Sequence, residues 1–132
     1  MKRIIFLYFL LLMACRRDDS GCPVRSCTKE LASILVEFTD KDGEKVEIED
    51  FNAVNVRTGD ILSNSQRDLD FPGYYVVVND TDIRSLSQEG DNIEVTGRLK
   101  GTDTIKSAII KVSGGCACHI KKISGPEKII FD

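Results

Sequence analysis

Five cysteines and a single histidine are the residues of this 132-residue chain most able to do chemistry. Cys22 and Cys27 lie near its beginning, and Cys116 and Cys118 lie near its end, where His119 follows them directly. Thiolates and imidazoles are the usual ligands of zinc, and thiols also form disulfides or take part in redox reactions. These residues could therefore form a metal site, a redox site or a structural staple.

The spacing of these residues fits a metal or redox site poorly. Cys-x4-Cys combined with Cys-x-Cys-His departs from the common zinc patterns, and the run C-A-C-H is one residue short of the haem-attachment pattern C-x-x-C-H. A redox-active Cys-x-Cys would need nearby positive charge, which Lys121 and Lys122 could supply. A periplasmic redox or metal-binding protein that uses Cys116, Cys118 and His119 therefore stays as the alternative.

The beginning of the chain indicates the compartment in which these cysteines would react. Lys2 and Arg3 precede an unbroken apolar run, Ile4 to Ala14, which ends at Cys15. Two positive charges followed by about 7–15 apolar residues are typical of an export signal. The run is too short to cross a bilayer, which takes about 20 apolar residues. We therefore predict a signal peptide over residues 1–14.

The end of this signal resembles the lipobox of bacterial lipoproteins. In Leu12-Met13-Ala14-Cys15, a branched apolar residue, a tolerant position and a small residue precede the cysteine. The resemblance implies cleavage before Cys15 and acylation of its thiol by palmitate or similar chains, several of which anchor a protein firmly. The charged segment that follows, with Asp18 and Asp19, resembles the surface-export signal of Bacteroidota lipoproteins. We expect a tether over residues 15–21 and an outer-membrane location, on the cell surface or the periplasmic face.

Assigning Cys15 to lipid leaves four cysteines in an exported domain, where thiols are expected to pair. Cys116 and Cys118 lie two residues apart on an expected strand, so that their side chains share a face and cannot easily bond each other. The N-terminal pair should therefore bond the C-terminal pair, either as Cys22–Cys116 with Cys27–Cys118 or in the reverse combination. Each bond would close a loop of nearly the whole domain, worth about 4–5 kcal/mol in the chain-entropy model.

Two groups of carboxylates could bind calcium, although each has a simpler explanation. Asp40, Asp42 and Glu44 alternate within an acidic stretch, but they lack the glycine and glutamate of an EF-hand loop. Asp80-Thr81-Asp82, with Asp91, follows an expected strand, where capping of a helical turn is the simpler role. We therefore expect no cofactor, with calcium and zinc as the alternatives.

His119 would be the base of a hydrolase if a nucleophilic serine and an acid lay beside it. The chain has several serines, but it has no Gly-x-Ser-x-Gly elbow that would present one of them. The expectation from the sequence is therefore that the protein is not an enzyme.

Alternating apolar residues between frequent turn residues predict a sheet protein. Period-two patterns predict strands over 34–38, 46–49, 53–57, 74–78, 92–99, 104–112, 116–123 and 128–131. The first two should form a β-hairpin around residues 40–43, and the third should bury Val54 and Val56. The fourth is the most apolar and is expected at the centre of a sheet. Residues 61–71 should form a loop, and Asn79 should cap a short helical turn.

Seven or eight short strands without a long helical period predict an all-β fold, a single antiparallel β-sandwich over residues 22–132. The run Asp42-Gly43-Glu44-Lys45-Val46, after an alternating strand, resembles the opening hairpin of transthyretin-like and carboxypeptidase-regulatory-like sandwiches. The run from Gly115 to Pro126 resembles a C-terminal signature of small Bacteroidota lipoproteins of that type. Members of these groups are mostly not enzymes, so that the resemblance implies a binding or structural module.

The net charge of the mature chain argues against nucleic-acid binding. Removing Lys2 and Arg3 with the signal lowers the basic count from 18 to 16 against 21 acids, a net charge of −5. Such a domain lacks the clustered basic face of a nucleic-acid-binding protein. The expected function is a membrane-anchored binding, adhesion or accessory lipoprotein stapled by two disulfides, with an unknown protein or glycan as ligand.

Loops usually carry binding in a domain of this kind. We therefore expect the ligand at two loops, Ser63–Gly73 and Asn79–Gly90, which should lie at the end away from the anchor. The tether, the staple and the C-terminal strand are expected to share the other end.

Overall fold

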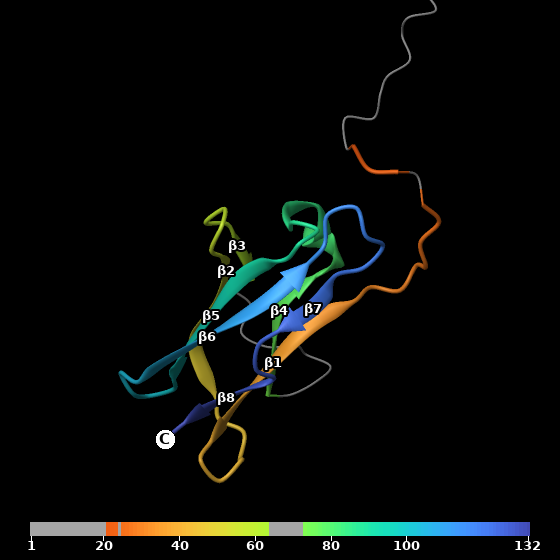
Figure 1. The fold of residues 1–132 in the computed structure, drawn as a ribbon. Coiled ribbons are helices and arrows are strands. Elements are labelled where there is room, and N and C mark those ends of the chain that lie inside the picture. The colour runs from red at the N-terminus through yellow and green to blue at the C-terminus, as the bar shows by residue number, and fades with distance from the viewer. Residues whose placement is uncertain (1–20, 24, 64–72) are drawn as a thin grey trace, which may run out of the picture.

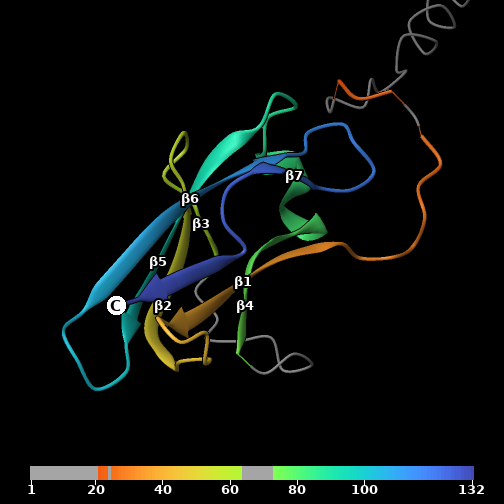
Figure 2. The same ribbon diagram turned by 60° about the horizontal axis from the view of Figure 1, so that its bottom comes forward.

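The computed structural model describes residues 21–23, 25–63 and 73–132, which form eight strands in two sheets (Figures 1 and 2). The elements are β1 (Ser33–Asp40), β2 (Ile48–Asn55), β3 (Ile61–Ser63), β4 (Tyr74–Asn79), η2 (Asp80–Ser85), β5 (Asp91–Leu99), β6 (Ile105–Ser113), β7 (Lys121–Ser124) and β8 (Lys128–Phe131). The predicted signal peptide, the predicted lipidation site Cys15, nearly all of the predicted tether and most of the loop 63–73 lie outside the described residues.

The two sheets pack face to face and confirm the predicted all-β sandwich. One sheet has the strand order β4-β1-β8, and the other has the order β3-β2-β5-β6-β7. The neighbouring strands are antiparallel, with the exception of β1 and β8, which run parallel. In the described part of the chain, no helix is long and apolar enough to cross a membrane.

The core lies between the sheets and is organised by aromatic rings. Phe38 of β1 meets Tyr75 edge to face at 5.3 Å between centroids, and Phe51 of β2 at 6.2 Å. The Tyr75 hydroxyl accepts a hydrogen bond from the Ile48 N–H at 3.0 Å, which links the two layers. Buried aliphatic side chains from both sheets fill the remaining space: Val36, Val77, Val78, Ile93, Val95, Ile110 and Val112.

The predicted hairpin between the first two strands is wrong, although its turn forms. Around residues 40–43 the chain turns, and just beyond the turn Thr39 and Lys45 form an isolated bridge, next to which the Val46 N–H donates to the Phe38 carbonyl at 3.0 Å. The next strand, β2, pairs with β5 and β3 in the opposite sheet. The chain changes layers because Phe51 packs against Phe38 from the opposite side of the core.

The faces predicted for residues 53–57 are also wrong. Ala53 and Asn55 are fully buried, whereas Val54 is half-buried and Val56 is 57% exposed. The expected inward and outward positions are therefore exchanged.

A β-bulge at Asp50 explains this exchange. Asp50 has a positive φ of 54°, and the register with β5 shifts between Glu49 and Asn52. Such a bulge inserts one residue into one strand of a pair and so reverses the alternation that follows it. As a result, Ile48 and Phe51, three residues apart, both point into the core.

Two further predictions about strand positions fail. Residues 61–63, expected in a loop, form the edge strand β3 beside β2. The apolar strand β4 lies at the edge of its sheet, not at the centre, which is occupied by β1. In a sandwich, an edge strand can still bury one face deeply, as β4 does with Tyr75 and Val77. The helical turn capped by Asn79 is confirmed, because the Asn79 side chain accepts from the Thr81 N–H at 2.8 Å.

Gly97 sits where the aromatic cluster leaves no room for a side chain. A Cβ at this position would lie 2.6 Å from the Ile48 Cγ2 atom and 3.0 Å from the Phe38 ring. We expect Gly97→Ala to lower the free energy of unfolding by about 1–3 kcal/mol, because overpacking forces neighbouring side chains to shift. Ser107→Ala on the exposed face of β6 is the matched control and should change it by less than about 0.5 kcal/mol. Urea unfolding measures both, and equal effects would contradict the packing argument.

Candidate functional site

Two disulfides join the N-terminal segment to the turn that precedes β7. Cys22 bonds Cys116 and Cys27 bonds Cys118, with Cα–Cα distances of 5.2 and 5.3 Å. The prediction that the N-terminal pair bonds the C-terminal pair is confirmed, and the structure selects the first of the two combinations. We call this region, which includes η2 and the turn at 114–119, the staple end.

The strand predicted over residues 116–123 is wrong in its first half. Residues 115–119 form turns and bends, and β7 begins only at Lys121. The turn is held against η2, because Gly115, with a φ of 69°, donates to the Ile83 carbonyl at 2.7 Å and Gly114 donates to the Ser87 carbonyl at 3.0 Å. In this turn each cysteine faces a different partner in the N-terminal segment.

The disulfides occupy the cysteines that a metal site or a redox site would need. All four sulfurs are bonded in pairs, so that Cys116 and Cys118 offer neither a thiolate ligand for zinc nor a dithiol in this state. Within the described ranges, no group of three or more histidine, cysteine, aspartate or glutamate side chains is placed to hold a metal ion.

Asp80, the first residue of η2, links three segments at the staple end. Its carboxylate accepts from the N–H groups of Ala32 and Ile120, each at 2.8 Å, and lies 2.6 Å from Nδ1 of His119. Burial disfavours the charged form of this carboxyl, but the hydrogen bonds outweigh it and hold the pKa of Asp80 below its ordinary value. The carboxylate therefore ties the N-terminal segment and the 114–119 turn to the sheet.

The other nitrogen of the His119 ring faces a hydroxyl. Thr28 Oγ1 lies 2.8 Å from Nε2. We assign the imidazole proton to Nδ1, because that nitrogen faces a carboxylate, which can only accept. Nε2 then accepts the hydroxyl proton of Thr28. The three side chains form a continuous hydroxyl–imidazole–carboxylate chain, which the sequence analysis did not anticipate.

A signal for this arrangement was present in the sequence. Thr28 follows Cys27, and His119 follows Cys118, so that the bond between these two cysteines brings the hydroxyl and the ring together. The sequence contains no comparable indication that Asp80 would contact His119, because this contact depends on how η2 packs at the end of β4.

A second carboxylate, this one buried, lies at the same end. Asp91, at the start of β5, accepts from Arg57 Nε and a terminal nitrogen, each at 2.7 Å, from Asn55 at 2.8 Å and from the Ser87 N–H at 3.1 Å. The Arg57 guanidinium holds the pKa of Asp91 far below its usual range, against the effect of burial. Arg57 also donates to the Ser85 carbonyl. The pair thus joins the ends of β2, η2 and β5.

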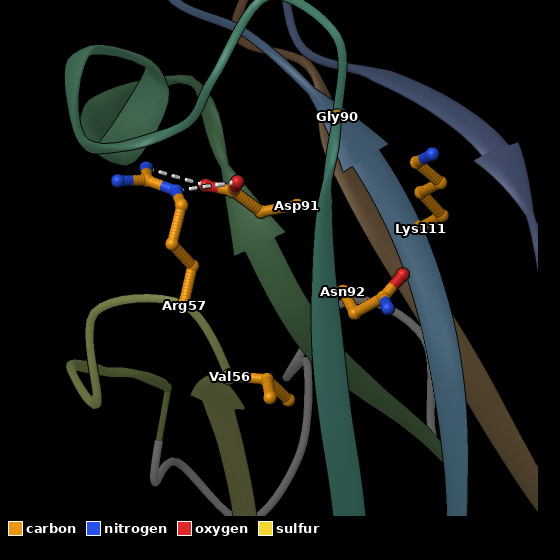
Figure 3. Close-up of a pocket in the computed structure, with 6 residues that line it drawn as sticks. All are labelled: Val56, Arg57, Gly90, Asp91, Asn92 and Lys111. Atoms are coloured by element: carbon orange, nitrogen blue, oxygen red, sulfur yellow. Dashed lines mark hydrogen bonds and ion pairs between the residues drawn. The ribbon is translucent and has the colours of Figure 1, made fainter.

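Two shallow surface depressions flank these clusters. One, of about 270 Å³, is lined by Val56, Arg57, Gly90, Asp91, Asn92 and Lys111, and Figure 3 shows Arg57 directed toward Asp91 at its border. The other, of about 240 Å³, lies beside the Cys22–Cys116 disulfide and is lined in part by Arg25 and Gln88. Both are smaller than the usual pocket for a drug-sized molecule, which holds about 300–1,000 Å³.

Three of the carboxylates considered for calcium, those of Asp40, Asp80 and Asp91, already bond to protein donors. Asp80 and Asp91 serve separate clusters, and Asp40 Oδ1 accepts from the N–H groups of Asp42 and Glu44 in its own turn, both at 2.9 Å. The simpler explanation of these acids as turn and capping residues is the one that fits their observed bonds.

The predicted placement of the two ends needs correction. The Asn79–Gly90 loop lies at the staple end, because β4 runs antiparallel to β1 and Asn79 pairs with Ser33. The C-terminal strand ends at the opposite side, where Phe131 pairs with Asp40, and Figure 1 shows the C-terminus far from the departing N-terminal segment. Because β8 runs parallel to β1, the C-terminal strand ends away from the staple and not, as predicted, beside it.

Comparisons of the chain with protein-family models, with curated proteins and with solved structures gave no match.

Asp91→Asn should lower the free energy of unfolding by about 2–3 kcal/mol at pH 7, because Arg57 keeps its charge but loses its partner. A carboxyl with a depressed folded-state pKa stabilises the fold above its unfolded pKa, near 4, and this contribution is lost as the pH falls further. The variant should therefore show a shallower loss of stability below about pH 4. Urea unfolding from pH 7 to pH 2 measures this. Asp103→Asn, at an exposed turn, is the control, and an equal change there would contradict the role of Asp91.

Removal of one disulfide should lower the free energy of unfolding by less than half as much as removal of both. With one bond present, the other closes only the short ring between the two bonds, worth about 2–3 kcal/mol, whereas the first closes more than 90 residues, worth about 4–5. We expect Cys22→Ser/Cys116→Ser to lose about 2–3 kcal/mol and the variant that lacks all four cysteines to lose about 7. Denaturant unfolding measures each loss, and additive losses would contradict this interleaved arrangement.

Proposed function

We propose that the protein is an exported, lipid-anchored β-sandwich lipoprotein of the outer membrane that acts as a binding or accessory module. The observation that carries this proposal is the pairing of four cysteines in two disulfides. Such bonds persist in oxidising compartments outside the cytosol, which supports the export signal at residues 1–14. The pairing also leaves Cys15 as the fifth cysteine, at the position where a lipoprotein is acylated.

The anchor would set the orientation of the domain. Six residues separate Cys15 from Cys22, the first residue of the staple, and the seven steps from Cα to Cα span at most about 25 Å. The staple end would therefore stay close to the membrane. The turns at the opposite end would face outward.

The outward end suggests a macromolecular partner. Its turns expose the carboxylates of Asp42, Glu44 and Asp103, and complementary charge guides association between proteins. We propose a protein with a basic surface as the partner at this end, in place of the two loops expected from the sequence. A binding role also agrees with the small size of both described depressions.

Expression of the full chain in a bacterial host with a lipoprotein pathway tests the proposal. The protein should sediment with membranes and give an intact mass that begins at Cys15 and carries acyl chains. Denatured but unreduced protein should take no thiol label. Cys15→Ala, the control, should carry no acyl chain and leave the outer-membrane fraction. Unacylated protein that keeps residues 1–14, or two or more reactive thiols, would overturn the proposal.

A further inference from the structure

The chain Thr28–His119–Asp80 has the geometry of an activated hydroxyl. Oγ1 of Thr28 lies 2.8 Å from Nε2 of His119, and Nδ1 lies 2.6 Å from Asp80 Oδ2. Enzymes activate a hydroxyl in this way, with a nucleophile and a base in hydrogen-bond contact and a third group that orients the base. Neither the resemblance to lipoproteins nor the binding role accounts for this arrangement.

The surrounding bonds hold the three groups in place. The Cys27–Cys118 disulfide directly precedes both Thr28 and His119 and fixes their backbones side by side. Asp80 is itself oriented by two backbone N–H groups, those of Ala32 and Ile120. A catalytic constellation needs such support from neighbouring bonds if its geometry is to persist.

The hydroxyl is open to a reactant. Thr28 is exposed, and the His119 side chain is 32% exposed, whereas the Asp80 side chain is only 11% exposed. The bond from Thr28 to Nε2 is not needed to satisfy a buried group, since water could replace the hydroxyl there. In the part of the chain that the structure describes, the N–H of Lys29 donates to no acceptor. It is available to the carbonyl oxygen of a bound ester, as is the N–H that follows the nucleophile in many hydrolases.

We propose that Thr28 Oγ1 is a nucleophile that accepts acyl groups from small carboxylic esters. Oγ1 attacks the carbonyl carbon while its proton passes to Nε2 of His119. The tetrahedral intermediate then collapses, the bond to the leaving alkoxide breaks, and His119 returns the proton to that oxygen. The products are an ester at Thr28 and a free alcohol. Asp80 is a positioning residue that holds the ring and stabilises its charged form.

This activity goes beyond the proposed binding function and does not depend on it. A single transfer modifies the protein covalently without repeated turnover. Thr28 lines neither of the two described depressions and is exposed, which fits a small acyl group presented at the surface.

The experiment treats the full-length oxidised protein with p-nitrophenyl acetate and follows nitrophenol release, intact mass and the acetylated position by peptide mapping. Thr28→Val removes the hydroxyl at nearly constant shape, and Thr28→Ser restores it. His119→Gln removes the base. Thr104→Val, at an exposed turn before β6, is the matched control. Intact mass and thermal unfolding establish that each variant keeps its two disulfides and its fold.

We expect one acetyl group at Thr28 in the unmodified protein and in the Thr104→Val variant. Acetylation at this position should be absent in Thr28→Val, restored in Thr28→Ser and slowed at least about 100-fold in His119→Gln. Acetylation confined to lysines, acetylation of Thr28 that is equally fast in His119→Gln, or no reaction in either the threonine or the serine protein would overturn the proposal. None of these results affects the lipid anchor or the binding role.

Discussion

The meeting of the two ends of the domain at one covalent staple is the constraint on which the rest of this structure depends. The described residues before β1 belong to no strand, and besides the bonds to Cys116 and Cys118 they are held by hydrogen bonds and by the packing of Ala32 against the core. A domain of this size has one core and modest stability. Closing more than 90 residues of chain removes entropy from the unfolded state and adds stability that this core need not supply.

Two carboxylates, that of the partly buried Asp80 and that of the buried Asp91, join the segments at the staple end together with the disulfides. The end of a sandwich exposes the termini of strands from both layers, where backbone N–H groups lack ladder partners. Asp80 satisfies two of these groups, and Asp91 satisfies one together with Arg57 and Asn55. An ionised carboxylate accepts several donors and repays its desolvation only when they are all present. This explains why both acids lie at the staple end, where three or more segments must be joined within a small volume.

The sequence predicted the features that depend on local pattern. The alternation of β5 and β6, the cap at Asn79 and the cross-pairing of the cysteines all follow from neighbouring residues or from parity. It failed where tertiary contacts decide. The bulge at Asp50 reverses the faces of β2, and no residue type around it marks the position where the extra residue enters. β4 lies at the edge of its sheet, and β8 pairs in parallel with β1. Both positions depend on which strands pair with each other, and the sequence of a single strand does not determine this.

In the candidate site too, some positions follow from the local sequence and others only from tertiary contacts. Once Cys27 is known to bond Cys118, the approach of Thr28 to His119 follows from chain connectivity alone. The third member, Asp80, is brought in by the antiparallel pairing of β4 with β1, which places the start of η2 over the N-terminal segment. A covalent bond thus positions the hydroxyl and the base, and sheet topology positions the acid. If Cys15 is the lipid anchor, as we propose, this chain of groups would lie on the membrane side of the domain, opposite the turns that carry Asp42, Glu44 and Asp103. The two ends would then serve different purposes, with chemistry close to the lipid surface and partner binding away from it.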